Sequence, residues 1–161
     1  MRKIRKKFKR PKKPWDSKRI ADEKGIMKTY GLRSKRELWR AEDTLRQFRR
    51  RARELIAVED PEKQKTLKDR LVKLGMLSKE AGLDDVLALE INMLLDRRLQ
   101  TIIARRNMAS TPMHARQMIT HGHVFIGDRK TRFPSYLVES GEESMIRTTA
   151  VRKEETEKKG E

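Results

Sequence analysis

The sequence predicts an α+β protein that is mainly α-helical, and three observations support this fold class. Apolar residues recur at steps of three and four over most of the chain, which is the period of an amphipathic helix. Serine, aspartate, proline and glycine stand where such helices would begin and end. Alternating apolar residues, the pattern of a strand, follow only after Gly122. We therefore expect four segments: a basic extended arm over 1–33, a small helical domain over 34–90, a module of two helices and a hairpin over 91–150, and a mobile charged tail over 151–161.

Charge is distributed very unevenly along the 161 residues. The chain has 41 Lys and Arg against 24 Asp and Glu, a net charge of +17, and only 35% of its residues are hydrophobic. Residues 1–53 hold 22 basic and 6 acidic residues, residues 54–95 hold 6 and 9, and residues 96–132 hold 8 and 2. Two basic zones separated by a mildly acidic one indicate two contact surfaces for one polyanionic partner.

Several classes of protein are excluded or disfavoured by composition. Without cysteine there is no disulfide framework, thiol nucleophile or cysteine-ligated zinc, and three histidines are too few to replace those ligands. No apolar run approaches the roughly 18 residues that span a bilayer. We expect a soluble, cytoplasmic protein with no metal site, no cofactor, no enzymatic activity and no membrane partner.

The first segment is too charged to fold alone. Nine of its first thirteen residues are basic and none is acidic, so we expect it to become ordered on a polyanion. Phe8 and Trp15 are placed to stack on unpaired bases, and a tether between the arm and the folded body is an equal alternative for Trp15. The expected anion contacts of the arm are Lys6, Lys7, Arg10, Lys12 and Lys13.

A long helix is predicted after Ser34. The spacing of Ser34 and Glu37 is that of a capping box, in which each side chain satisfies the other's backbone N–H. Its apolar stripe consists of Leu38, Ala41, Leu45, Phe48, Ala52 and Leu55. Guanidinium groups on the sides and back of this helix suit phosphate binding, and the candidates are Arg46, Arg49, Arg50 and Arg53.

A second helix is predicted to pack on the first as a helical hairpin. Asp60 and Pro61 are typical of an N-cap and first helical position, and the apolar face of Leu67, Leu71 and Leu74 ends at Gly75. Further along, Asp84, Asp85 and Glu90 are acidic residues near a helix start, where they favour the macrodipole rather than form a catalytic pair.

The C-terminal module is predicted to contain two helices and a hairpin. One apolar helix face runs from Ile91 to Ile103, and Ser110, Thr111 and Pro112 begin a short helix from Met113 to His121. A strand over 123–126, a turn at 127–128 and a return strand over 129–133 follow. The expected core residues here include Met113, Met118 and Phe125.

Four runs in this module resemble the S4 RNA-binding module: Leu95–Leu99, Ala109–Ser110, Ala115–Val124 and Pro134–Val138. Some pseudouridine synthases, tyrosyl-tRNA synthetases and ribosome-rescue proteins also carry that module. The arm, the arginine-rich helix, the hairpin and the module together resemble the small-subunit ribosomal protein S4 family in its archaeal and eukaryotic form.

The resemblance implies a structural protein that binds the five-prime domain of small-subunit rRNA, acts early in assembly, and lies in the ribosome near the path by which mRNA enters, beside another small-subunit protein. The zinc cluster of some bacterial members is not implied, because cysteine is absent. Thr111–His114 replaces the serine-arginine start found in many bacterial members, which puts one phosphate contact in doubt.

Charge and resemblance together indicate the RNA-contacting residues of the module. Arginines can bridge phosphates bidentately, and the free amides at the start of the Met113 helix are a further anion site. Arg97 has the alternative of pairing with Asp96 or Glu90, and either histidine has the equal alternative of capping helix carbonyls. The candidates are Arg97, Arg98, Arg105, Arg106, Arg116, Gln117, His121, His123, Lys130 and Arg132.

Three alternatives to a structural ribosomal protein are left by the sequence. A ribosome-biogenesis factor shares this architecture and would associate with precursor particles rather than mature subunits. An RNA-modifying enzyme would need a catalytic domain, which the 90 residues before the module do not resemble. A DNA-compacting protein would not prefer structured RNA over duplex DNA at matched salt.

Overall fold

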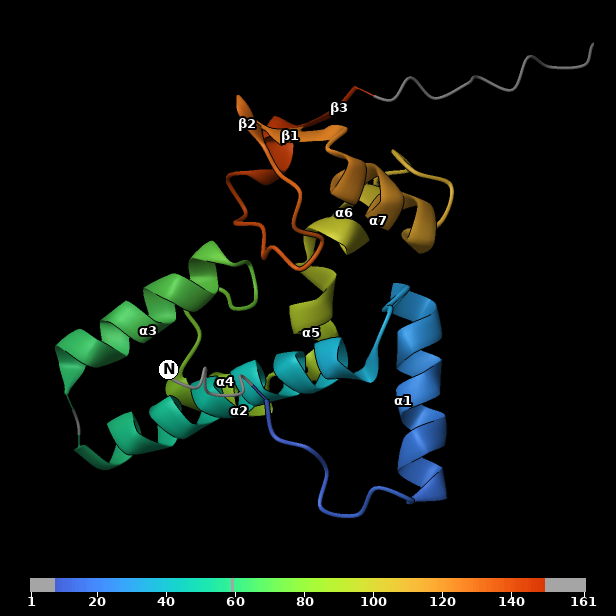
Figure 1. Cartoon of the computed structure of the whole chain (residues 1–161). Helices are drawn as coiled ribbons and strands as arrows, with labels where there is room; N and C mark the ends of the chain where they lie inside the picture. Colours follow the sequence, from blue (N-terminus) through green and yellow to red (C-terminus); the bar gives the residue numbers. More distant parts are fainter. Residues whose placement is uncertain (1–7, 59, 150–161) are drawn as a thin grey trace, which may run out of the picture.

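The computed structural model describes residues 8–58 and 60–149, and these are mainly helical with a small antiparallel sheet near the C-terminal end (Figure 1). The candidate contacts Lys6 and Lys7 and the charged tail over 151–161 lie outside the described residues. Within the described ranges, no helix is long and apolar enough to cross a membrane.

The prediction that the whole of 1–33 is extended is wrong, because Ser17–Tyr30 forms the helix α1. Asp16 caps its first turn by accepting from the Arg19 backbone N–H, and Gly31 ends it in the left-handed conformation with φ of 59°. The helix is held by the buried carboxylate of Glu23, which pairs with Arg19 and Lys35 and accepts from the Trp39 indole N–H at 3.1 Å. One ion pair and one hydrogen bond therefore hold this charge-rich stretch against the next helix.

The helical hairpin that follows confirms the prediction. Helix α2 (Lys35–Val58) buries the five residues Leu38, Ala41, Leu45, Phe48 and Ala52 of its apolar stripe. Helix α3 (Pro61–Lys73) starts at the expected Asp60 cap and buries Leu67 and Leu71 against α2. Helix α4 (Leu83–Ala88) and helix α5 (Ile91–Asp96) pack on α2 and complete this first core.

The single helix expected over 91–103 is broken in two. Helix α5 ends at Asp96, and α6 (Leu99–Arg105) begins after Arg98, whose backbone is extended. The break is stabilised from outside the helix: the Leu99 N–H donates to the Tyr136 carbonyl, and the Val138 N–H donates to the Arg97 carbonyl. Hydrogen bonds to a distant segment thus replace helical ones at this point.

The C-terminal module has a second core and one strand more than expected. Helix α7 (Pro112–His121) packs on α6, and β1 (Val124–Ile126) pairs with both β2 (Arg129–Lys130) and β3 (Ile146–Thr148). The return strand is shorter than predicted, and the third strand was not predicted at all. The second core contains Leu99, Ile102, Ile103, Ala109, Ala115, Met118, Ile119, Val124, Val138 and Ile146.

Of the three expected core residues of this module, only Met118 belongs to the second core. Met118 is buried and Phe125 is half-buried, but Met113 is 55% exposed, so its assignment to the core is wrong. Met113 precedes Met118 by five residues, which places it on the opposite side of α7 from the face that packs on α6. Both residues are methionines, so their positions on the helix, and not their hydrophobicity, decide which of them is buried.

Replacement by alanine is predicted to change the stability of the protein in opposite directions at two glycines, one inside α1 and one at its C-terminal end. In Gly31→Ala, a Cβ would lie 2.8 Å from the Pro112 Cβ on a backbone of positive φ, so we expect destabilisation by at least about 1–2 kcal/mol. In Gly25→Ala, inside α1, nothing lies within 4 Å of the new Cβ, and the variant should be more stable by about 0.5–1 kcal/mol. Urea denaturation of both variants measures the two changes, and two changes of the same sign would contradict this packing of α1 against α7.

Candidate nucleic-acid interface

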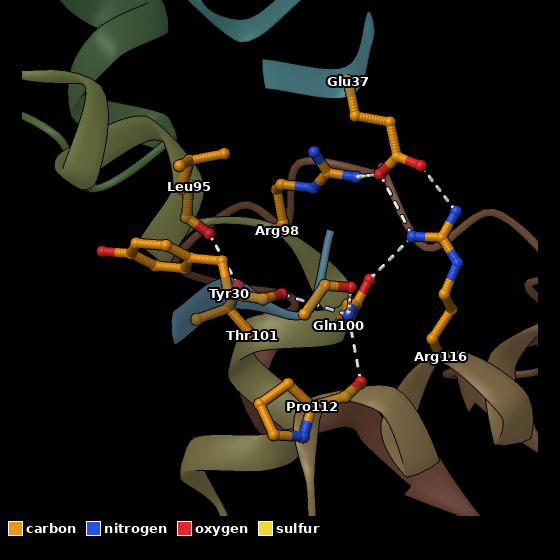
Figure 2. Close-up of polar contacts among 9 residues, drawn as sticks. Tyr30, Glu37, Leu95, Arg98, Gln100, Thr101, Pro112 and Arg116 are labelled. Carbon is orange, nitrogen blue, oxygen red and sulfur yellow. Dashed lines mark hydrogen bonds and ion pairs between the residues drawn. The ribbon is translucent and has the colours of Figure 1, made fainter. Parts of the chain in front are cut away.

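A partly buried ion cluster joins the helical domain to the C-terminal module. The carboxylate of Glu37, on α2, accepts from Arg98 Nη2 at 2.9 Å, and from Arg116 at 2.7 Å and 3.1 Å (Figure 2). Arg98 stands at the α5–α6 break and Arg116 lies on α7. We call these three residues the Glu37 cluster. The prediction that Glu37 closes a capping box with Ser34 is wrong, because both of its oxygens are directed at the arginines.

Gln100 ties the same region to α1. Its side chain is buried, and its Nε2 donates toward the carbonyls of Tyr30, Gly31 and Pro112 at 2.9–3.2 Å. Its Oε1 accepts from Arg116 Nη1 at 3.3 Å, which connects it to the Glu37 cluster (Figure 2). The end of α1, the start of α7 and the start of α6 therefore meet at one side chain.

The Glu37 cluster remains ionised at neutral pH. Burial favours a raised pKa for Glu37, but the hydrogen bonds and charges of Arg116 and Arg98 outweigh it, and the pKa is lowered from its ordinary value. Burial lowers the pKa of Arg98 although Glu37 opposes the shift. Arginine nevertheless stays protonated in proteins, so the cluster carries two positive charges and one negative charge.

Three of the candidate RNA contacts are turned into the protein. Arg98 is only 5% exposed and paired with Glu37, so it is not part of an exposed basic surface, and its contact with RNA stays a prediction. The mostly buried side chain of Arg116 is held by the same carboxylate. Arg97 pairs with Glu143, and not with Asp96 or Glu90, and it donates to the Val138 carbonyl at 3.0 Å. Sequence position alone does not distinguish an arginine of this kind from a surface one.

Arg105 and Arg106 lie nearer the surface, in local ion pairs. Arg105 pairs with Asp96, and its side chain remains 59% exposed. Arg106 pairs with Glu143 at 3.2 Å and also donates to that residue's carbonyl. Both remain candidates for contact with an anion, in competition with these carboxylates.

Five of the predicted residues come together at the C-terminal end of α7. The imidazole rings of His121 and His123 stack with centroids 6.4 Å apart on either side of Gly122. Lys130 lies directly against Gly122, and Arg132 Nε would lie 3.3 Å from a Cβ there. All are exposed, and in the described part of the chain no ion pair joins Lys130 or Arg132 to a carboxylate. We call this group the α7-end surface: Gln117, His121, His123, Lys130 and Arg132.

A second basic face runs along α2. Arg46 and Arg50 are exposed and pair with Asp43 and Glu54 on the same helix, and Arg53 is exposed. Arg49 instead turns inward and donates to the Leu89 carbonyl, so it ties α2 to the end of α4, and its assignment to the RNA surface is not supported. Arg40, which the sequence analysis missed, is exposed one turn before Thr44. The α2 basic face is defined as Arg40, Arg46, Arg50 and Arg53.

The described end of the arm is also basic and exposed. Arg10, Lys12 and Lys13 are exposed, and Arg19 on α1 holds this stretch by donating to the carbonyls of Lys13 and Pro14. Trp15 is 90% exposed, so the alternative that it tethers the arm to the folded body is not supported. Phe8 instead contacts Trp39, with ring centroids 5.9 Å apart.

Comparison with known proteins identifies the C-terminal module. Residues 97–144, which contain the α5–α6 break, the α7-end surface and most of the small sheet, match the S4 domain family. The chain is therefore an S4-domain protein. The match does not cover the helices before residue 97.

Similarity over nearly the full length assigns the chain to a more specific family. It is 47% identical over 148 residues to small ribosomal subunit protein uS4 of Korarchaeum cryptofilum, covering 91% of this chain and 89% of that one. It is 48% identical over 149 residues to the protein of the same name from Hyperthermus butylicus, covering 90% and 84%. The Saccharolobus solfataricus protein is 42% identical over 149 residues, covering 90% and 82%. The chain belongs to the uS4 family of small ribosomal subunit proteins.

The variant Glu37→Gln tests the ion cluster. It leaves Arg98 buried without a carboxylate, so we expect a loss of about 3 kcal/mol of unfolding free energy at neutral pH. The folded-state pKa of Glu37 is lowered, so the native state binds fewer protons than the unfolded one. The stabilisation is therefore fully present above the ordinary glutamate pKa of about 4.3 and is lost as pH falls through the folded-state value.

Denaturation of wild type and variant at a series of pH values measures this difference. The gap in unfolding free energy should be constant near neutrality and should close in acid. A gap that persists unchanged below pH 4 would show that Glu37 does not act as an ionised partner.

Proposed function

We propose that this chain is a structural constituent of the small ribosomal subunit, and that it binds the five-prime domain of small-subunit rRNA at a helical junction early in assembly. The observation that carries the proposal is the α7-end surface, where two cations and two imidazoles from α7, β2 and the segments next to them converge, and where no ion pair joins either cation to a carboxylate among the described residues. The names of the relatives support it, because they are small-subunit proteins.

The chemistry of this surface suits the backbone of folded RNA. Lys130 and Arg132 supply charge for phosphate oxygens, and Gln117 supplies an amide for ribose hydroxyls or base edges. The deep major groove of an A-form helix is poorly accessible to side chains. Recognition is therefore of the folded shape of a junction and not of a linear sequence.

The α2 basic face provides a second contact on a different element. It belongs to the basic zone of residues 1–53, whereas the α7-end surface belongs to the zone of residues 96–132. The Glu37 cluster links the two elements that carry them. A protein that holds two RNA segments at a set separation lowers the free energy of the junction in which they have that separation.

The proposed partners are small-subunit rRNA, neighbouring small-subunit proteins, and mRNA near its point of entry, in cytoplasmic ribosomes. Crosslinking in cells, with sequencing of the attached nucleic acid, tests this assignment. Crosslinks should concentrate in the five-prime domain of mature small-subunit rRNA. Crosslinks confined to precursor RNA, or scattered over DNA, would contradict it.

Replacing two cations of the α7-end surface tests the proposed contact. Lys130→Ala with Arg132→Ala should weaken binding to a five-prime-domain rRNA fragment by about 10-fold or more, because two phosphate contacts are lost. The slope of log affinity against log salt should fall by about 2. Fluorescence anisotropy across a salt series measures both quantities.

The control removes the same charge elsewhere. Lys65 and Lys79 are exposed on and after α3, away from both proposed surfaces, and their double alanine variant should bind nearly as wild type. Equal losses in the two double variants would mean that net charge, and not this surface, determines binding.

A further inference from the structure

A cleft of about 400 Å³ lies beside the Glu37 cluster, between α2 and the segment 134–137. Ala41, Leu94 and Leu137 give it apolar walls. Its polar lining consists of Glu37, Arg40, Thr44, Arg98, Arg116 and Ser135. Both modules therefore contribute to it: Arg40 comes from α2, while Arg98 and Arg116 come from the C-terminal module.

The cleft has an excess of positive charge. Three guanidinium groups line it against the single carboxylate of Glu37, whose two oxygens are already taken by Arg98 and Arg116 (Figure 2). Within the described residues, Arg40 forms no ion pair, and its charged group instead lies 5.9 Å from the Phe8 ring centroid. The charged groups that line the cleft therefore sum to +2.

Arg98 carries unused hydrogen-bonding capacity in the wall of the cleft. Arg98 is only 5% exposed, and its Nε has no hydrogen-bond partner among the described residues. Its one ion pair uses Nη2. Buried donors are nearly always satisfied in folded proteins, so an acceptor that reached Arg98 would be stabilised there.

The position of the cleft indicates where that acceptor comes from. Arg40 belongs to the α2 basic face, and Arg116 lies on α7, the helix whose C-terminal end carries the α7-end surface. The cleft is lined by residues of both helices, and Ser135 in its lining is exposed. Phosphate oxygens match planar guanidinium groups bidentately.

We propose that this cleft is a binding site for one phosphate group of the RNA backbone, held by Arg40 and by the guanidinium groups of Arg98 and Arg116. The proposal rests on the proposed function, since it assumes that RNA is the partner. Arg98 and Arg116 are positioned for the phosphate by Glu37, and the phosphate in turn bridges α2 and the C-terminal module. RNA binding therefore stabilises the same relative orientation as the Glu37 cluster.

Directed cleavage locates the RNA at the cleft. The chain has no cysteine, so Ser135→Cys provides a unique attachment point for an iron–EDTA probe at the cleft mouth. Bound to a five-prime-domain rRNA fragment, the labelled protein should cut the RNA around one backbone position. The same label at Lys79→Cys, remote from the cleft, should not produce these cuts.

A chemical double-mutant cycle then tests the phosphate itself. A neutral methylphosphonate placed at the position cut most strongly should weaken wild-type binding by about 10-fold, the effect of a lost charge-assisted hydrogen bond. In Arg40→Ala the same RNA change should have a smaller effect, because one of the three guanidinium partners of the phosphate is already gone. Arg40 is exposed, so its replacement avoids the unfolding expected of Arg98→Ala.

The control variant is Arg51→Ala, on the same helix three turns further along, which should respond to the methylphosphonate as wild type does. Equal methylphosphonate effects in wild type and Arg40→Ala, or no cuts from Ser135→Cys in a complex that forms, would overturn the cleft proposal alone. Failure of the wild-type protein to bind the fragment would overturn the proposed function and the cleft proposal with it.

Discussion

The carboxylate of Glu37, shared by Arg98 and Arg116, is the interaction on which the arrangement of this molecule depends. It is the place where α2 of the helical domain meets both the α5–α6 break and α7 of the S4 domain. At the break the backbone of Arg98 is extended, and its side chain reaches Glu37 on α2 while Leu99 starts a new helix. The Glu37 cluster thus links the element that carries the α2 basic face to the one that carries the α7-end surface, and Arg98 and Arg116 also contribute positive charge to the cleft.

A link made of ion pairs, such as the Glu37 cluster, suits a chain that has few apolar residues. Only 35% of the residues are hydrophobic, and they form two separate cores, one around α2 and one between α6, α7 and the sheet. The first core also includes Leu94, Leu95 and Leu137 of the C-terminal module, and these apolar contacts are non-directional. Hydrogen-bonded ion pairs are directional, and Gln100 adds contacts to Tyr30, Gly31 and Pro112 that hold α1 in the same frame. We expect the cluster to contribute more to a unique orientation than to total stability, because the desolvation of its charges offsets much of their attraction.

Sequence reasoning identified what depends on local pattern. The stripe of α2, the cap of α3, and α7 with its terminating Gly122 follow from periodicity and capping residues. Sequence reasoning failed where distant residues decide the structure. Helix α1 depends on the buried Glu23 and its partners from α2, and the α5–α6 break depends on carbonyl and amide groups from residues 136–138. Strand β3 pairs with a strand about twenty residues earlier in the chain. The site follows the same division. Residues around Gly122 are brought together by local connectivity, whereas the inward turn of Arg49, Arg97 and Arg98 depends on acceptors that no local pattern indicates.

The distance between the two modules tests this account most directly. Because cysteine is absent, the exposed substitutions Lys65→Cys on α3 and Thr120→Cys on α7 provide two defined attachment points, one spin label in each module. Pulsed electron paramagnetic resonance should find a single narrow distance distribution with Glu37 in place, and a broad one in Glu37→Gln while helical content is retained. An equally narrow distribution, at the same distance, in the folded Glu37→Gln variant would contradict the claim that this carboxylate sets the orientation of the two RNA-binding surfaces.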